Sequence, residues 1–273
     1  MFVLAEVRKI MLQKNLKIIL ASLGKATLSN CYFSYKEIEK KCNSNQIDVI
    51  AEEHIVILIE KKETFHRLYY FLDGVDVSDS IWMKIRKNLL SYELLSAERV
   101  ERSQECLMPE VLVNLKFRSY KTYIRLSFVN KGTSEYEIHT DIGFATEEDV
   151  NAVYELFRCT FDDVSDTLAT KEELLEFVNK KQIIKISEQR EIAGVLLFED
   201  KGVKSYIRML CVDAPYRNKG IGYELVKEYF NIHRQNTKLF YLWVDADNQS
   251  AINLYNHFGY TRDGLVNYIY VRD

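Results

Sequence analysis

The amino-acid sequence predicts an α+β fold in which a mixed central sheet carries helices on both faces. Apolar runs separated by charged turns indicate β-hairpins, and longer segments with apolar residues at helical spacing indicate helices. A third observation, a similarity between the two halves of the chain, favours two tandem copies of this fold. The composition, 47% hydrophobic and 28% charged residues, is typical of a globular protein.

The internal similarity lies in two hairpin-like segments. Residues 55–72 align without gaps onto residues 193–210, and each half ends with an aromatic strand, at residues 123–126 and 268–271. The polar residues 130–135 read as a linker. We therefore expect an N-terminal domain over residues 1–137 and a C-terminal domain over residues 138–273. Chance similarity between two amphipathic hairpins remains the alternative.

The second half has the clearer pattern of elements. A capping signal at residues 146–149 starts one expected helix, and further helices are expected over residues 171–179 and 220–234. The inward side of the last of these is expected to carry Ile221, Leu225, Tyr229 and Ile232. Strands are expected near residues 183–187, 192–198 and 206–212.

Residues 239–244 form a continuously apolar run, which predicts a strand buried on both faces. Asn248 can cap the helix that follows, and Gly259 can end it. Two short strands are expected to complete the chain.

Charge and cysteine usage exclude several classes of function. A net charge of -3 offers no basic field for nucleic acid or a membrane surface. No stretch approaches the roughly 20 apolar residues of a membrane helix, and the run at residues 18–23 is too short for a signal peptide, so it is expected to be a buried helix or strand. Five cysteines without a C-x-x-C pair, and scattered histidines, predict no disulfide framework and no metal site. A cytoplasmic protein is expected.

Residues 212–222 join an expected strand to an expected helix and form an anion cradle. Gly220 and Gly222 leave room for backbone amides to approach a ligand, and the helix start adds unpaired N–H groups and a positive dipole end. Arg217 and Lys219 add positive charge at the rim. A pyrophosphate group fits this description.

Two common phosphate loops do not match. The Walker pattern G-x-x-x-x-G-K-[ST] is absent from this segment. The dinucleotide fingerprint G-x-G-x-x-G fails because Leu225 stands at the position of the third glycine.

The pattern Arg217-x-x-Gly220-x-Gly222 instead resembles the acyl-CoA pyrophosphate loop of the GCN5-related N-acetyltransferase (GNAT) family. A second family pattern follows it in the expected order and spacing. Its positions here are Asn248, Ala251, Tyr255, Gly259 and Tyr260. Together the two motifs cover most of residues 140–273.

The resemblance implies the acyl-CoA N-acyltransferase fold and acetyl-CoA as cosubstrate, with no metal. Pantetheine would lie where the parallel strands 206–212 and 239–244 splay apart. Backbone groups of Leu210, Cys211 and Val212 would pair with the pantetheine amides, those of Arg217, Asn218, Lys219, Gly220, Ile221 and Gly222 would hold the pyrophosphate, and Asn248 would contact the pantetheine arm. Tyr255 would protonate the leaving thiolate, unless it is only a packed aromatic residue.

The general base is not identified. Family members often carry a glutamate on the strand before the loop, but residues 206–209 contain none. Asp245 or a chain of waters could serve, although Asp245 can equally be a solvated strand-end residue. Arg208 could bind a substrate carboxylate, or it could pair with a neighbouring acid.

The resemblance implies an N-acetyltransferase that moves an acetyl group to a primary amine of a small molecule or peptide. The alternatives are an acyl-CoA sensor without turnover and a protein-directed acetyltransferase that docks through its N-terminal half. That half has the acidic segment 73–80 at the place of the cradle, and so resembles the degenerate first copies of tandem family members. A monomer or a homodimer is expected.

Overall fold

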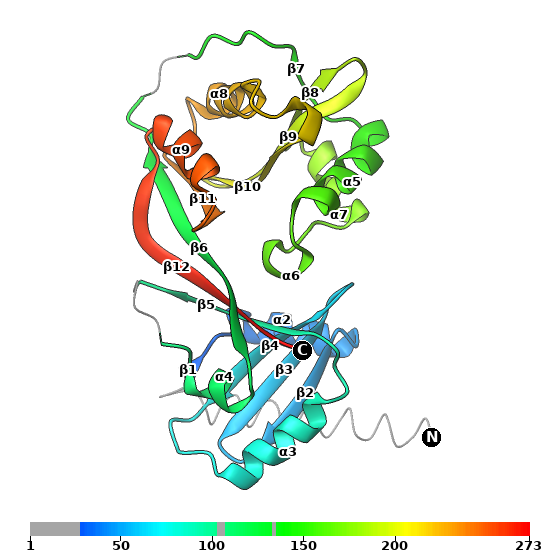
Figure 1. Cartoon of the computed structure of the whole chain (residues 1–273), viewed down its shortest axis with the longest axis vertical. Helices are drawn as coiled ribbons and strands as arrows, with labels where there is room; N and C mark the ends of the chain where they lie inside the picture. Colours follow the sequence, from blue (N-terminus) through cyan, green and yellow to red (C-terminus); the bar gives the residue numbers. More distant parts are fainter. Residues whose placement is uncertain (1–27, 103–106, 133–134) are drawn as a thin grey trace. The chain divides into compact units, whose positions relative to one another are not determined.

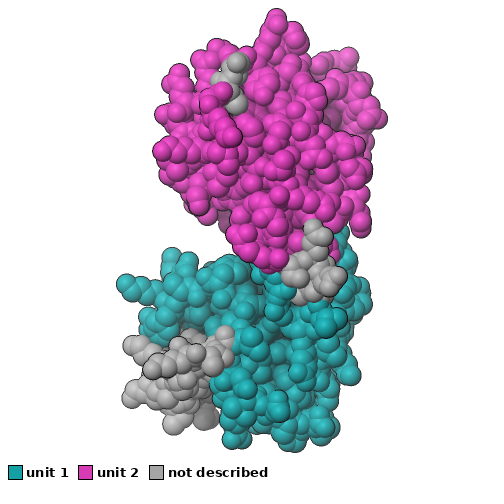
Figure 2. Space-filling model, turned by 90° about the vertical axis from the view of Figure 1, so that its left-hand side faces the viewer, with its two compact units in different colours: residues 1–101, 105–121, 267–273 teal, residues 102–104, 122–266 magenta. Residues whose placement is uncertain are grey.

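The computed structural model describes residues 28–102, 107–132 and 135–273 (Figure 1). The apolar run at residues 18–23 lies outside the described residues, as does part of the expected linker. Two compact units divide the chain (Figure 2): unit 1 comprises residues 1–101, 105–121 and 267–273, and unit 2 comprises residues 102–104 and 122–266. Among the described helices, none is long and apolar enough to cross a membrane.

Unit 1 is a sheet with helices on both faces. Its strand order is β2-β3-β4-β5-β12, and β1 pairs with β4. Helix α2 packs through Ile38 on one face, and α3 packs through Trp82 and Ile85 on the other. The bounds are β1 Leu28–Ser29, α2 Tyr35–Asn43, β2 Ile47–Glu52, β3 Ile55–Lys61, β4 His66–Leu72, α3 Asp79–Leu89, β5 Leu95–Glu101 and α4 Glu110–Asn114.

Unit 2 is also a sheet with helices on both faces. Its strand order is β6-β11-β10-β9-β8-β7. The bounds are β6 Arg118–Val129, β7 Ile142–Phe144, η1 Glu147–Asp149, α5 Val150–Thr160, α6 Asp163–Asp166, α7 Lys171–Asn179, β8 Ile183–Glu188, β9 Glu191–Lys201, β10 Lys204–Val212, η2 Ala214–Tyr216, α8 Ile221–His233, β11 Leu239–Asp245, α9 Gln249–His257 and β12 Thr261–Arg272. The expected α+β fold, with a mixed sheet and helices on both faces, is confirmed.

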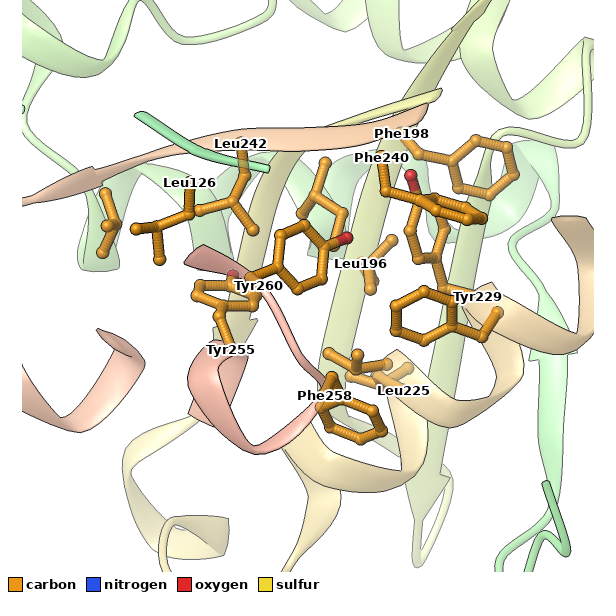
Figure 3. Close-up of a cluster of buried hydrophobic side chains, with 14 of the residues drawn as sticks. Leu126, Leu196, Phe198, Leu225, Tyr229, Phe240, Leu242, Tyr255, Phe258 and Tyr260 are labelled. Atoms are coloured by element: carbon orange, nitrogen blue, oxygen red, sulfur yellow. The ribbon is translucent and has the colours of Figure 1, made fainter. Parts of the chain in front are cut away.

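Two apolar clusters hold the helices of unit 2 to its sheet. On one face α8 and α9 contribute Leu225, Tyr229 and Tyr255 to a core that includes Phe240 and Leu242 of β11 (Figure 3). On the other face, α5 and α7 pack on β9 and β10 in a separate cluster. Burial of these aromatic and aliphatic side chains supplies most of the driving force for folding of the unit.

The last strand of each half of the sequence completes the sheet of the other unit. Residues 122–129 of β6 belong to unit 2, where they pair with β11, and residues 267–272 of β12 belong to unit 1, next to β5 in the strand order. The compact units therefore divide the chain differently from the expected boundary at 137/138. Local sequence patterns predicted both strands, but they carry no information on which sheet a strand joins.

The two expected hairpins are confirmed, with different turns. In unit 1 Lys61 pairs with His66 and leaves residues 62–65 in the turn, whereas in unit 2 Lys201 pairs with Lys204 and leaves residues 202 and 203. Because the turns differ in length by two residues, an ungapped alignment of the two halves cannot match both strands of the two hairpins at once.

Most expected elements of the second half are confirmed. Thr146 closes a capping box at the start of η1 and α5, and α7 spans the expected residues. Two expectations are wrong. Ile232 has an exposed fraction of 37%, because Phe230 and His233 take the inward positions at the end of α8. A single strand, β12, replaces the two short final strands and continues past Gly264, whose φ of +89° suits a residue without a side chain.

Strand β11 was expected to be buried on both faces, and this is also wrong. Its residues alternate between buried and half-buried along the whole strand. Phe240, Leu242 and Val244 enter the core under α8 and α9, so Tyr241 and Trp243 lie on the opposite face. The continuous apolar run reflects large aromatic side chains on the less buried face.

Candidate active site

The parallel strands β10 and β11 pair for only part of their length. The paired positions run from Lys204 with Leu239 to Ile207 with Leu242. Beyond that point β11 pairs with β6 and β10 pairs with β9. In the described part of the chain, the edge of β10 that faces β11 therefore has no strand partner from Arg208 to Val212, and its backbone groups are open to a ligand that adds like a strand.

A β-bulge at Arg208 marks the point of divergence. The register with β9 shifts between Ile207 and Met209. Residues two apart on a regular strand share a face, but Ile207 packs in the core under α8 while Met209 packs in the cluster of α5 and α7. The extra residue bends and twists β10 away from β11. The expected splay of residues 206–212 and 239–244 is thus present in unit 2.

The open edge leads directly into the cradle. Gly220 is the N-cap of α8, with φ +80° and no capping side chain, so the first amides of the helix lack the usual internal partner. Asn218 also adopts a left-handed backbone, with φ +63°. The Arg217 amide donates to the carbonyl oxygen of Ala214 at 3.4 Å. A left-handed backbone next to a helix start is typical of turns whose amides bind anions.

The two basic side chains of the loop lie at its rim. Arg217 Nε donates to the carbonyl oxygen of Val212 at 3.1 Å, and Lys219 Nζ lies 5.0 Å from the ring centroid of Tyr216. Asp213 accepts a hydrogen bond from the Ala214 amide at 2.7 Å and starts the η2 turn before the loop. The amides form the floor of the cradle, and the charges lie beside it.

Gly194 in β9 packs against the start of α8, where the cradle lies. The sequence analysis did not identify this residue. A Cβ atom on Gly194 would lie 2.6 Å from Cγ2 of Ile221, the first residue of α8. A Cβ atom on Gly222 would be at ordinary contact distance, 3.7 Å from Leu254 and Val212. The glycine in β9 therefore allows the start of α8 to approach the sheet. A glycine within an apolar strand pattern was the available signal.

Helix α9 places two of the expected residues. Asn248 is its N-cap and accepts from the Ala251 amide at 3.1 Å, so its side-chain amide group stays available for another partner. Gly259, with φ +86°, ends the helix as expected. The Asn248 cap and the open edge of β10 both belong to unit 2.

Tyr255 lies on the buried side of α9 with an exposed fraction of 6% (Figure 3). Its ring centroid is 5.7 Å from that of Tyr260, and its hydroxyl is not among the fully buried groups without a partner, which include the Tyr260 hydroxyl. Burial raises the pKa of Tyr255 above the usual tyrosine value, and the nearby Tyr206 adds to this shift. The hydroxyl therefore stays protonated at neutral pH, as a proton donor must.

The acidic and basic candidates of the sequence have ordinary partners. Arg208 donates to Glu199 Oε1 at 3.1 Å and to the carbonyl oxygen of Thr167 at 3.2 Å, so it pairs with a neighbouring acid. Asp245 Oδ1 accepts from the Asp247 amide at 3.0 Å at the end of β11.

Unit 1 has the same divergence between parallel strands, but its gap is filled. Strands β4 and β5 pair only at residues 66–67 and 95–96, and β1 pairs with the end of β4. Between these points Asn30 Nδ2 donates to the carbonyl oxygens of Leu68 and Glu98 at 3.2 and 3.1 Å, and its Oδ1 accepts from the Tyr70 amide at 2.8 Å. A side-chain amide of the chain itself bridges the two strands.

Comparison with known proteins agrees with this geometry. The profile of the Acetyltransferase (GNAT) family matches residues 150–260. N-alpha-acetyltransferase 30 of Xenopus laevis is 39% identical over 61 residues, which are 22% of this chain and 22% of that protein. The similarity thus covers under a quarter of that relative's length.

Solved structures resemble most of the chain. A GCN5-related N-acetyltransferase from Sphaerobacter thermophilus has a TM-score of 0.58 at 15% identity, covering 88% of this chain and 86% of that one. A tandem GNAT protein from the clavulanic acid biosynthesis pathway has a TM-score of 0.52 at 13% identity, covering 91% and 83%. The chain has the fold of these proteins, and its residues 150–260 match the model of the GNAT acetyltransferase family.

Proposed function

We propose that unit 2 transfers an acetyl group from acetyl-CoA to a primary amine. The observation that carries this proposal is the continuity between the unpaired edge of β10 and the amide-lined turn at Gly220. An extended pantetheine arm can add to the edge as a strand does, while its pyrophosphate rests on the turn and the positive end of α8. In unit 1 Asn30 occupies the corresponding edge of β4, and Asp73 lies at the place of the amide-lined turn.

Binding would use backbone groups more than side chains. Leu210, Cys211 and Val212 present amides and carbonyls along the open edge, and Asn248 offers its side-chain amide. The pyrophosphate would be held by the amides of Arg217, Asn218, Lys219, Gly220, Ile221 and Gly222. Since backbone dipoles are fixed by the fold, they need little rearrangement when the ligand arrives.

The reaction needs a neutral amine and a protonated acid. The amine nitrogen attacks the thioester carbonyl carbon, a C–N bond forms, and the C–S bond breaks. The departing thiolate takes the hydroxyl proton of Tyr255, and the amine gives up a proton to a base or to solvent. Because burial raises the pKa of Tyr255, its hydroxyl carries a proton at neutral pH.

Unit 1 is proposed to be a degenerate copy of the same fold. It has the same strand order and the same short parallel pairing as unit 2. Asp73, at the place of the cradle, accepts from His54 at 2.7 Å and from the Val75 amide at 3.0 Å. A carboxylate at this place would repel a pyrophosphate.

A charge introduced at Gly220 tests the cofactor site. A Cβ atom there has nothing within 4 Å, and aspartate and asparagine tolerate a positive φ better than other residues. Gly220→Asp and Gly220→Asn should therefore both fold. Calorimetry should show at least a tenfold weaker affinity for acetyl-CoA in Gly220→Asp than in Gly220→Asn. Equal affinities would place the pyrophosphate elsewhere.

Turnover is tested separately by thiol release from acetyl-CoA with a panel of amines, amino acids, amino sugars and peptides. Release that depends on the acceptor supports the enzyme. Tight binding of acetyl-CoA without release for any acceptor would instead favour an acyl-CoA sensor.

A further inference from the structure

The sheet of unit 2 has an aromatic face, defined here by Tyr206, Tyr241, Trp243 and Arg125. These residues alternate with core residues on β10, β11 and β6, so they lie on the side of the sheet away from α8 and α9. The rings of Tyr206 and Tyr241 stack with centroids 5.0 Å apart and planes 13° apart. All four side chains are incompletely buried.

We expect an acceptor to reach the gap between β10 and β11 from this face, because the other side is packed. On the other side Ile207, Leu242 and Tyr255 are all at most 6% exposed within the core. The last paired residues before the gap are Ile207 and Leu242, and Trp243 follows directly. The aromatic face therefore borders the place where the thioester would lie.

Arg125 is held over this face by two kinds of contact. Its Nε donates to Asp263 Oδ2 at 2.6 Å. Its guanidinium carbon lies 5.7 Å from the ring centroid of Tyr241 and 5.9 Å from that of Trp243, close enough for cation–π attraction. Arg125 is also paired with Trp243 in the register of β6 and β11, one position beyond the last contact of β11 with β10.

Most of the donors of Arg125 remain unused. A guanidinium has five N–H groups, and Asp263 engages the one on Nε. The other oxygen of Asp263, Oδ1, accepts from the Leu265 amide of its own strand at 3.2 Å. The Nη1 and Nη2 atoms of Arg125 have no partner among the described residues.

Arg208 lies on β10, which β11 separates from the strand of Arg125, and it shows the difference. Both of its terminal nitrogens are occupied, by Glu199 and by the carbonyl oxygen of Thr167. Arg125 instead combines a fixed position, a partly desolvated setting (side chain 28% exposed) and a free pair of nitrogens. A guanidinium whose two terminal nitrogens are free can bind a carboxylate through two parallel hydrogen bonds.

We propose that Arg125 is a specificity-determining residue that binds the carboxylate of the acceptor, and that the acceptor is a small amine carrying a carboxylate, as an α-amino acid does. Its side chain would lie on the rings of Tyr206 and Tyr241, and its amine would point to the gap beside Trp243. Asp263 is a positioning residue that orients Arg125. This inference rests on the proposed acetyltransferase function.

The test compares acceptors that differ only in the carboxylate. Thiol release from acetyl-CoA is measured with L-phenylalanine against 2-phenylethylamine, and with L-leucine against isoamylamine. We expect the amino acid to have at least a tenfold higher kcat/KM in one or both pairs. Equal values, or a preference for the amines lacking the carboxylate in both pairs, would overturn the proposal.

Variants then connect this preference to Arg125. Arg125→Gln should raise KM for the amino acid about 10–100-fold, the usual loss for a charged hydrogen-bonded pair, and leave the KM for acetyl-CoA and the rate with the decarboxylated amine unchanged. Arg125→Lys should recover part of the loss. Arg234→Gln, which removes a surface pair with Glu135, is the control and should behave as wild type. Parallel loss with both acceptors would mean that Arg125 is only structural.

A binding measurement separates this inference from the proposed function. Calorimetry with the CoA-saturated protein measures the affinity for L-phenylalanine, L-leucine and their decarboxylated amines. If no acceptor releases thiol, but an amino acid binds at least tenfold more tightly than its amine and Arg125→Gln removes the difference, the carboxylate site stands and the acetyltransferase proposal fails. If neither amino acid binds nor reacts, the carboxylate site is refuted.

Discussion

At the scale of single residues, Tyr255 and Tyr260 form a natural comparison. Both rings belong to the core beneath β11 (Figure 3), and the Tyr260 hydroxyl is fully buried without a hydrogen-bond partner among the described residues. Only Tyr255 comes from α9, whose N-cap Asn248 is an expected pantetheine contact. The two hydroxyls therefore allow catalysis to be separated from packing.

Tyr255→Phe should slow acetyl transfer by about 10²–10⁴-fold, the usual contribution of a general acid. The affinity for acetyl-CoA should stay nearly the same, because the pyrophosphate and pantetheine contacts are elsewhere. Tyr260→Phe removes the hydroxyl of the neighbouring core tyrosine and should keep full activity. Single-turnover kinetics of both variants decide the point, and a fully active Tyr255→Phe enzyme would remove this residue from the mechanism.

Asp149 links a helix cap to the sheet and should make stability sensitive to acid. Its Oδ1 lies 2.5 Å from Lys185 Nζ, and its Oδ2 accepts from the Thr146 amide at 2.7 Å. Burial alone would raise the pKa of Asp149, but the hydrogen bonds from Lys185 and Thr146 outweigh burial and lower it.

Because the folded-state pKa of Asp149 is lowered, its stabilisation is complete above the ordinary carboxyl pKa and is lost as the pH falls through the folded value. The free energy of unfolding of wild type should therefore exceed that of Asp149→Asn at neutral pH, and the difference should shrink as the pH falls below the ordinary aspartate pKa of about 4. Urea titrations across this range measure it. Asp273→Asn, at an exposed pair with Arg118, should show little difference at any pH. A constant gap for Asp149→Asn would contradict the assignment.

At the scale of elements, the contact between β9 and α8 controls the cradle. The start of α8 can approach the sheet only because residue 194 is a glycine, and the amides of that start are the expected pyrophosphate ligands. The position of α8, which carries the expected pyrophosphate ligands, therefore depends on β9, which carries none of them.

Gly194→Ala should destabilise the protein by about 1–3 kcal/mol, since the new Cβ atom overlaps with Ile221 and overpacks the core. It should also weaken acetyl-CoA binding by moving the first turn of α8. Gly222→Ala meets only ordinary contacts and should change the free energy of unfolding by no more than about 0.5 kcal/mol. Equal melting temperatures for the two variants would refute the close approach of β9 and α8.

The splay of β10 and β11 was an expectation of the family resemblance, and the bulge at Arg208 was not predicted, since nothing in the spacing of apolar residues requires either feature. The helix caps, in contrast, followed from local residues. Thr146 and Asn248 satisfy nearby amides, so their role is visible within a few positions of sequence.

At the scale of the whole molecule, the two units share a strand order but differ in what occupies the gap between their parallel strands. In unit 2 the gap is open on the edge of β10. In unit 1 Asn30 and β1 occupy the corresponding edge of β4. Because only unit 2 has an open gap, we expect a single cofactor site in the described part of the chain.

One acetyl-CoA should bind per chain. Asn30→Ala leaves three backbone groups without their partner and should destabilise the protein by about 1–3 kcal/mol, but it should not create a second site, because Asp73 remains where the cradle would be. The control for stability is Ser29→Ala, which removes a hydroxyl that accepts a hydrogen bond from the Cys31 amide at 2.9 Å. Calorimetric stoichiometry near one for wild type and Asn30→Ala is expected, and a value of two for wild type would refute the degenerate-copy interpretation.

By itself the sequence determined the α+β class, the elements of the second half and the cradle with its family resemblance. These features depend on apolar periodicity, capping residues and glycine spacing, all of which act within one element or one turn. Only the tertiary structure decided which sheet β6 and β12 complete, that Asn30 fills the gap of unit 1, and that Arg125 lies over Tyr241 and Trp243. Those contacts join residues far apart in the chain, and strand pairing between distant segments leaves no local period from which a partner could be read.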